Sequence, residues 1–199
     1  MQRIGVFCGS SPGNQPEYTQ AARELGKILA ERKIGLVYGG GRVGLMGELA
    51  SAVLSAGGEV TGVITRYLYQ RELAHPGITQ LQVVETMHER KALMAELADG
   101  FIALPGGLGT IEEIFEVLTW SQLGLQRKPG GLLNVCGYYD ALIRFLDHTV
   151  FAGFVAAEHR QMILVDTYPA RLLDQFENYQ PPEIDKVKLV IEETHKSRF

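Results

Sequence analysis

The chain has 199 residues, of which 46% are hydrophobic and 21% charged, and its formal net charge is −4. These values are typical of one globular domain with a substantial core. The mild acidic excess argues against nucleic acid as a partner, since phosphate backbones select basic surfaces. No apolar run approaches the roughly 20 residues that a membrane-spanning helix requires. We therefore expect a cytoplasmic protein without a membrane partner, in which Cys8 and Cys136 are buried thiols.

Short apolar segments alternate along the chain with segments of helical period. Strands are predicted at 4–9, 34–39, 59–64, 81–85, 100–106 and 130–137, with a short seventh at 162–166. Helices are predicted at 17–33, 44–57, 87–98, 110–123, 139–150 and 169–179. The longest irregular connection is 65–80, and connections of that length are often functional.

This alternation predicts the fold class. Continuous apolar strands are buried on both faces, and strand–helix alternation implies a parallel sheet with right-handed crossovers. We predict a single doubly wound α/β domain, Rossmann-like, with helices on both faces of the sheet. The domain is placed at 1–180 and a charged C-terminal tail at 181–199.

Two glycine-rich segments follow predicted strands, at the sheet edge where α/β proteins bind ligands. "YGGGRVG" (38–44) matches the dinucleotide fingerprint G-x-G-x-x-G. The next strand ends in Thr65 and Arg66 instead of the acid that would bind a ribose, so only a phosphate-binding role is predicted. A turn without a ligand at 38–44, and ordinary loop and capping chemistry by Ser10 and Ser11 of "CGSSPGN" (8–14), are the alternatives. The candidate phosphate-binding residues are Ser10, Gly39, Gly40, Gly41 and Gly44.

The helix predicted at 87–98 begins with a capping box formed by Thr86 and Glu89. Helical spacing then places Arg90 and Lys91 on an otherwise apolar stripe. Both cations also lie near the helix N-terminus, where the helix dipole disfavours them. Residues that break two local rules indicate a functional site. The alternative is a pair of snorkelling side chains with solvated head groups.

The segment "LPGGLGTIEE" (104–113) contains a second apparent capping box, Thr110 with Glu113. Glu113 is predicted to point away from the apolar face of its helix, towards Trp120. Either it caps the helix, or it serves a site covered by a cleft or a partner subunit. The apolar face is predicted to comprise Ile111, Ile114, Phe115, Leu118 and Leu125.

These two helix starts carry a family resemblance. "PGGLGTIEE" (105–113) fits the pattern PGGxGTxxE, and "MHERK" (87–91) supplies a second signature. The chain resembles the Lonely Guy (LOG) family of cytokinin riboside 5′-monophosphate phosphoribohydrolases from residue 8 to residue 139. Two spaced motifs are more specific than the glycine fingerprint alone.

The resemblance implies hydrolysis of the N-glycosidic bond of AMP or N6-prenylated AMP, releasing the free base and ribose 5-phosphate. It implies a homodimer with the active site near its interface, and we expect neither a metal nor a cofactor. A carboxylate near the anomeric carbon stabilises the oxocarbenium-like transition state, and either attacks it or activates water. Glu113 is the candidate, and Arg90 is its electrostatic partner. The implied substrate-binding residues are Glu72, Lys91, Gly107, Leu108, Gly109, Thr110, Ile111, Glu112 and Thr119.

Two other functions use the same glycine loops. One is a non-catalytic nucleotide or molybdenum-cofactor carrier of similar fold, which needs neither Arg90 nor Glu113. The other is a dinucleotide-dependent oxidoreductase, which the missing ribose acid disfavours. Some LOG relatives carry a lysine decarboxylase label, whose chemistry requires a pyridoxal phosphate Schiff base.

Overall fold

The computed structural model describes residues 1–71 and 73–182. In this part of the chain seven parallel strands form one sheet in the order β4-β3-β2-β1-β5-β6-β7. The doubly wound α/β fold predicted from the sequence is confirmed. The strands are β1 (Arg3–Phe7), β2 (Gly35–Tyr38), β3 (Val60–Thr65), β4 (Gln80–Val84), β5 (Gly100–Ala103), β6 (Gly130–Leu133) and β7 (Ile163–Asp166).

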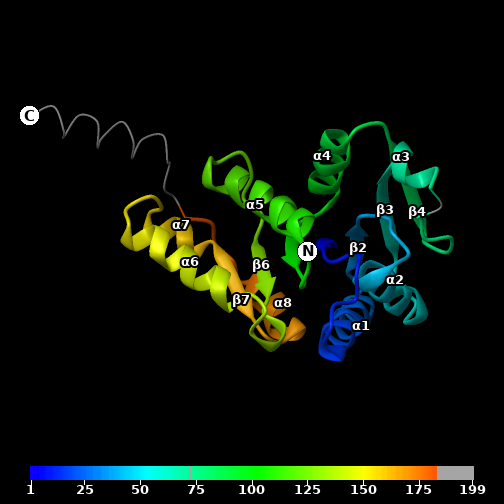
Figure 1. The fold of residues 1–199 in the computed structure, drawn as a ribbon, viewed down its shortest axis with the longest axis horizontal. Helices are drawn as coiled ribbons and strands as arrows, with labels where there is room; N and C mark the ends of the chain where they lie inside the picture. The colour runs from blue at the N-terminus through cyan, green and yellow to red at the C-terminus, as the bar shows by residue number, and fades with distance from the viewer. Residues whose placement is uncertain (72, 183–199) are drawn as a thin grey trace, which may run out of the picture.

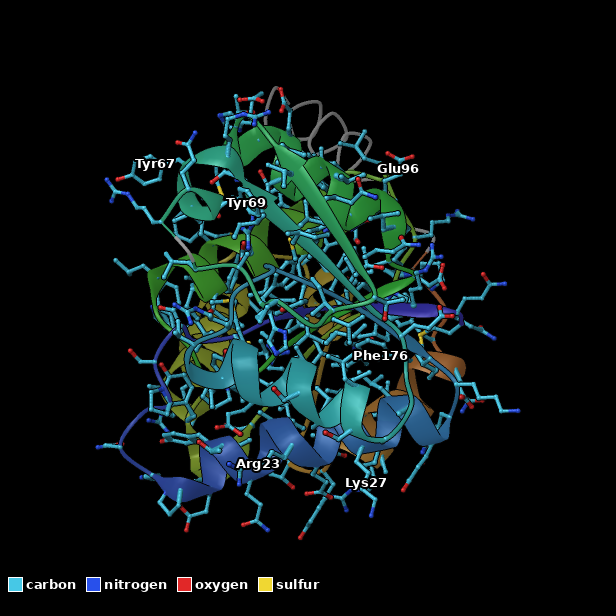
Figure 2. The ribbon with its side chains drawn as sticks, turned by 90° about the vertical axis from the view of Figure 1, so that its right-hand side faces the viewer. Arg23, Lys27, Tyr67, Tyr69, Glu96 and Phe176 are labelled. Atoms are coloured by element: carbon cyan, nitrogen blue, oxygen red, sulfur yellow. The ribbon has the colours of Figure 1, made fainter. Side chains whose placement is uncertain are left out.

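Helices cover both faces of the sheet (Figure 1). One layer contains α1 (Pro16–Glu31), α2 (Gly44–Ser55) and α8 (Pro169–Glu177), and the other contains α4 (Met87–Leu97), α5 (Leu108–Gln122) and α6 (Asp140–Phe151). Each layer has its own apolar core against the sheet. Figure 2 shows Arg23 and Lys27 on the outer side of α1, while Phe176 of α8 is buried. Among the described residues, no helix combines the length and apolar character needed to cross a membrane.

Several local predictions were wrong. The connection 65–80 contains a short helix, α3 (Arg66–Tyr69), and a further short helix, α7 (Ala157–Gln161), precedes β7. The strand predicted to reach residue 137 ends at Leu133, because Cys136 and Gly137 adopt positive φ angles of 51° and 70° in a 3-10 turn, η1 (Val135–Gly137). That turn also leaves Cys136 exposed instead of buried. Glu72 and residues 183–199, most of the predicted tail, lie outside the described residues.

The strand order reverses direction between β1 and β5. Phe7 and Ala103, the last residues of these two strands, are register partners. The loops that leave them are therefore adjacent, and the Gly9 amide donates a hydrogen bond to the Pro105 carbonyl at 3.0 Å. Such a switch point at the carboxyl edge is where open α/β sheets bind ligands.

Candidate active site

A cavity of about 420 Å³ lies at this switch point. Its walls come from the loop after β1, the first turns of α4 and α5, and side chains of α2 and α3. The cavity gathers eight residues predicted from the sequence: Ser10, Arg90, Gly107, Leu108, Gly109, Thr110, Glu112 and Glu113.

The buried ion pair between Arg90 and Glu113 is the central feature of the cavity. The Arg90 Nη1 atom lies 2.5 Å from Glu113 Oε1, and only 9% and 14% of the two side chains are exposed. Arg90 Nε also donates to the Val63 carbonyl within β3, at 2.9 Å. This burial excludes a snorkelling side chain with a solvated head group, the alternative left open for Arg90. The guanidinium therefore links β3 to α5 and holds the Glu113 carboxylate in place.

Burial sets the ionisation of Glu113. Removal of the carboxylate from water raises the pKa of Glu113 above its ordinary value, while the Arg90 charge and hydrogen bond oppose that rise. A raised pKa in a cavity, with an identifiable charge partner, is typical of a catalytic carboxylate. The same pattern occurs in structural ion pairs, so the position of the pair in the cavity is what makes it a candidate.

The N-terminus of α5 differs from the prediction. The helix begins at Leu108 with the extended residue Gly107 as its N-cap, so Thr110 is the third helical residue and forms no cap. Its side chain is buried against Gly106. Glu113 is thereby excluded as a capping residue. The amides of Leu108, Gly109 and Thr110 have no carbonyl partner within the helix, and they border the cavity.

The predicted direction of Glu113 was partly correct. Ile114 and Leu118 are buried as predicted, but Val117 is buried with them, and Leu125 lies beyond the helix and is 72% exposed. Both the apolar face and the Glu113 face are therefore covered. The cover over Glu113 is α4, through Arg90, together with the cavity walls.

Lys91 lies beside the cavity and has two carboxylate partners. Its ammonium is 2.5 Å from Glu112 Oε1 and 3.0 Å from Glu116 Oε1. The hydrogen bond to Glu112 raises the pKa of Lys91, with a smaller contribution from Glu116. Arg90 and Lys91 thus bind α4 to α5 through parallel charge pairs, one buried and one at the rim.

The glycines of the 38–44 segment do not line the cavity. A side chain at Gly39 would overlap the Arg90 guanidinium, and one at Gly44, whose φ is +60°, would overlap the Ser10 backbone. Gly40 and Gly41 face Ile64 and Met46 instead. Glycine here permits close approach of the chain to Arg90 and Ser10, and phosphate binding by these four glycines stays a prediction.

Two further candidates lie away from the cavity. Ile111 is half-buried and packs on the apolar core beneath α5. Thr119 is exposed, and its hydroxyl donates a hydrogen bond to the Phe115 carbonyl. It lines a separate cavity between α5, α6 and α7.

The sequence predictions omitted five residues that line the cavity: Cys8, Gly9, Met46, Leu68 and Met87. The Cys8 thiol is buried, which raises its pKa and keeps it protonated. Met46, Leu68 and Met87 form a soft apolar wall, a type of surface that adapts to different ligand shapes. No pattern in the sequence distinguishes these residues from ordinary core residues.

Fold and site together define a Rossmann-like α/β protein with a ligand cavity at its switch point. Solved structures share this fold. A molybdenum cofactor binding protein of Rippkaea orientalis matches with a TM-score of 0.68 over 89% of this chain and 96% of its own, at 21% identity. The molybdenum cofactor carrier protein of Chlamydomonas reinhardtii matches with a TM-score of 0.67 over 89% of this chain and 99% of its own, also at 21% identity. At such identity the likeness concerns the fold alone.

Sequence relatives are much closer. A cytokinin riboside 5′-monophosphate phosphoribohydrolase of Arabidopsis thaliana is 50% identical over 200 residues, covering 100% of this chain and 92% of its own. A rice enzyme of the same name is 49% identical, covering 90% of this chain and 74% of its own. The family model described as "Possible lysine decarboxylase" matches residues 46–176. The chain belongs to this family, which includes the LOG phosphoribohydrolases.

Proposed function

We propose that the protein hydrolyses the N-glycosidic bond of adenosine 5′-monophosphates, including those with an N6-prenyl group. Water adds to C1′ of the ribose, and the base leaves with a proton, giving free base and ribose 5-phosphate. The observation that carries this proposal is the buried Arg90–Glu113 pair, set in the wall of a cavity that the N-terminus of α5 also borders. The names of the close relatives support the same reaction.

Each part of the cavity fits one part of such a substrate. The amides of Leu108, Gly109 and Thr110, which have no carbonyl partner within α5, suit the 5′-phosphate, because helix N-termini attract anions. The Glu113 carboxylate suits the ribose, where it stabilises the positive charge that develops as the bond breaks. The soft wall of Met46, Leu68 and Met87 suits the base and an apolar N6 substituent.

Arg90 acts on Glu113 and not as a proton donor. An arginine guanidinium stays protonated at any working pH. With its hydrogen bonds to Glu113 and to the Val63 carbonyl, Arg90 keeps the carboxylate ionised and oriented. This arrangement preorganises negative charge where the transition state becomes positive.

Lysine decarboxylation fits these residues poorly. That reaction requires a lysine amine that forms a Schiff base with pyridoxal phosphate. Lys91, at the rim of the cavity, is held in its charged form by Glu112 and Glu116. A charged ammonium is not nucleophilic, so the geometry opposes this role.

We also propose a homodimer in the cytoplasm. Leu125, just beyond the end of α5, is 72% exposed, and Phe151 and Phe154, at and just beyond the end of α6, are 90% and 82% exposed. Large exposed apolar patches mark interaction surfaces. Thr119 of α5 lies at the cavity between α5, α6 and α7. Free thiols at Cys8 and Cys136 suit a reducing compartment.

The decisive experiment incubates the protein with AMP and with isopentenyladenosine monophosphate and measures the free base by chromatography. We expect release from both nucleotides and none from the corresponding ribosides, which lack the phosphate. Binding of a nucleotide without release of base would instead support the carrier function. If the protein neither binds the nucleotides nor releases free base, both functions are contradicted.

A further inference from the structure

The loop between β5 and α5 separates two cavities. On one side lies the candidate active site, and on the other a cavity of about 260 Å³ bordered by Tyr18 and Tyr138. Gly107 lines both cavities. A side chain built at Gly107 or Gly109 would find no heavy atom within 4 Å. Gly107 and Gly109 themselves therefore contribute no side-chain packing that would fix the start of α5.

Hydrogen bonds to three successive carbonyls hold the loop instead. The Tyr139 hydroxyl donates to the Leu104 carbonyl at 2.6 Å, and the Gly9 amide donates to the Pro105 carbonyl at 3.0 Å. The third donor is the Tyr138 hydroxyl, 2.5 Å from the Gly106 carbonyl. Each donor comes from another segment of the chain, so the loop is fixed from outside.

The bond from Tyr138 has the most direct consequence for the site. In a planar trans peptide unit the carbonyl and the following N–H point in opposite directions. A Gly106 carbonyl held by Tyr138 therefore turns the Gly107 N–H away from Tyr138. Gly107 is the N-cap of α5, so this peptide unit also sets where the helix and its free amides begin.

A strained turn supplies the two tyrosines. Cys136, a non-glycine residue, has a left-handed φ of 51°, and Gly137 follows with a φ of 70°. A side chain at Gly137 would lie 2.7 Å from Asp140 Oδ2. Asn134 closes the turn by accepting a hydrogen bond from the Tyr139 amide at 2.7 Å and donating one to Asp140 at 2.8 Å. Strain of this kind persists only where the surrounding structure holds it, and it clusters at functional sites.

We propose that Tyr138 is a positioning residue for the phosphate subsite at the N-terminus of α5. Tyr139 is buried and anchors the turn in the core, while the residue Tyr138 is 41% exposed and its ring packs edge-on against Tyr18 and Tyr139. Tyr138 does not touch the reacting atoms. It acts through the Gly106–Gly107 peptide, and the inference rests on the proposed placement of the 5′-phosphate.

The test is the variant Tyr138→Phe, which keeps the ring and removes the donor. The phosphate is remote from the bond that breaks, so its contacts stabilise the ground state and the transition state alike. We expect KM for AMP to rise about two- to tenfold, the effect of one hydrogen bond, with kcat within about twofold of wild type. The inhibition constant of ribose 5-phosphate should rise by the same factor, and that of adenine should not change.

Tyr18→Phe is the matched control. It removes a hydroxyl from the same cavity, and in the described part of the chain that hydroxyl makes no hydrogen bond to the loop. KM for AMP should stay at the wild-type value. An unchanged KM in Tyr138→Phe, or an equal rise in the inhibition constant of adenine, would overturn the proposed role of Tyr138.

A wild-type protein that releases no base from AMP would contradict the proposed function. The role of Tyr138 is then tested independently of catalysis, by measuring the binding of ribose 5-phosphate to both proteins by calorimetry. Weaker binding by Tyr138→Phe than by wild type is the expected result. Equal binding by the two proteins, or none by either, would overturn the inference.

Discussion

Arg90 and Glu113 belong to different helices, and each residue explains why the other can be buried as a charged group. Arg90 occupies the first turn of α4, where the helix dipole disfavours a cation, and it is buried there. Glu113 occupies the second turn of α5, where burial raises its pKa. Neither position is favourable alone, because each buried charge needs its partner.

The variant Glu113→Gln tests the role of the carboxylate. It keeps the shape of the side chain and removes the charge that stabilises the transition state. We expect kcat for AMP to fall by about 10²- to 10⁴-fold, measured by release of adenine. Glu48→Gln is the control, since Glu48 of α2 pairs with Arg23 of α1 and does not line this cavity; its kcat should stay within a few-fold of wild type. Near-normal activity of Glu113→Gln, with normal thermal unfolding, would exclude a catalytic Glu113.

The pH dependence of activity follows from the raised pKa of Glu113. The reaction needs the ionised carboxylate, so kcat/KM should fall on the acid side with an apparent pKa above the ordinary value of 4.5. Because Arg90 opposes the rise in pKa, Arg90→Gln should move this limb to higher pH. Arg66→Gln, which breaks an exposed pair with Glu85, should leave it unchanged. If the apparent pKa of the acid limb lies at or below the ordinary value for a glutamate, a group other than Glu113 controls the rate.

The raised pKa of Glu113 also makes the free energy of unfolding depend on pH, with its contribution to stability greatest at low pH. The folded-state pKa of Glu113 lies above its unfolded value, so the protonated form favours folding. This contribution is fully present below the unfolded pKa and is lost as pH rises through the folded pKa. Ionised Glu113 at neutral pH is thus obtained at a cost in stability, which is common at catalytic sites.

At the scale of elements, the geometry of the candidate site depends more on the loops and helix starts than on the regular helices and strands. Most predicted elements occur close to their predicted positions, because hydrophobic periodicity is a strong local signal. The start of α5 was misplaced because Thr110 and Glu113 have the spacing of a capping box, yet Thr110 is buried against Gly106. The turn at 135–137 was missed because a left-handed Cys136 has no sequence signature.

Gly44 and Gly57 offer a matched pair of substitutions. Both have positive φ angles, +60° and +78°, but only at Gly44 would an added side chain collide with backbone, that of Ser10. Gly57→Ala should cost about 1 kcal/mol of folding free energy, the penalty of a left-handed residue. Gly44→Ala should cost more and also raise KM for AMP, because it displaces the Ser10 loop. Equal unfolding temperatures for the two variants would contradict this account.

At the scale of the whole molecule, the sheet order brings the site together. Ser10 and Glu113 are distant in sequence, and they meet because β1 and β5 are neighbours in the sheet. Arg90 joins them from α4, which connects β4 to β5, by its bond to Glu113. The cavity between α5, α6 and α7 is likewise a product of tertiary packing.

Dimerisation is tested at this same scale. Wild-type protein in sedimentation equilibrium should have twice the chain mass of 22.0 kDa. Phe154→Asp places a charge on the proposed interface and should shift the protein towards monomer. Tyr168→Asp, at a residue that is 57% exposed at the start of α8, should remain dimeric. A monomeric wild type, or an unaffected Phe154→Asp, would exclude this interface.

The sequence by itself determined the fold class, the family resemblance and the identity of the two charged residues. These follow from periodicity and from short motifs, which are local properties of the chain. Only the tertiary structure decided that Arg90 and Glu113 form a buried pair, that Glu113 is not a cap, and that Gly39 and Gly44 make space for Arg90 and Ser10. It also revealed the tyrosines that hold "LPGG" in place. The physical reason is that burial, ion pairing and close backbone approach depend on which distant segments meet.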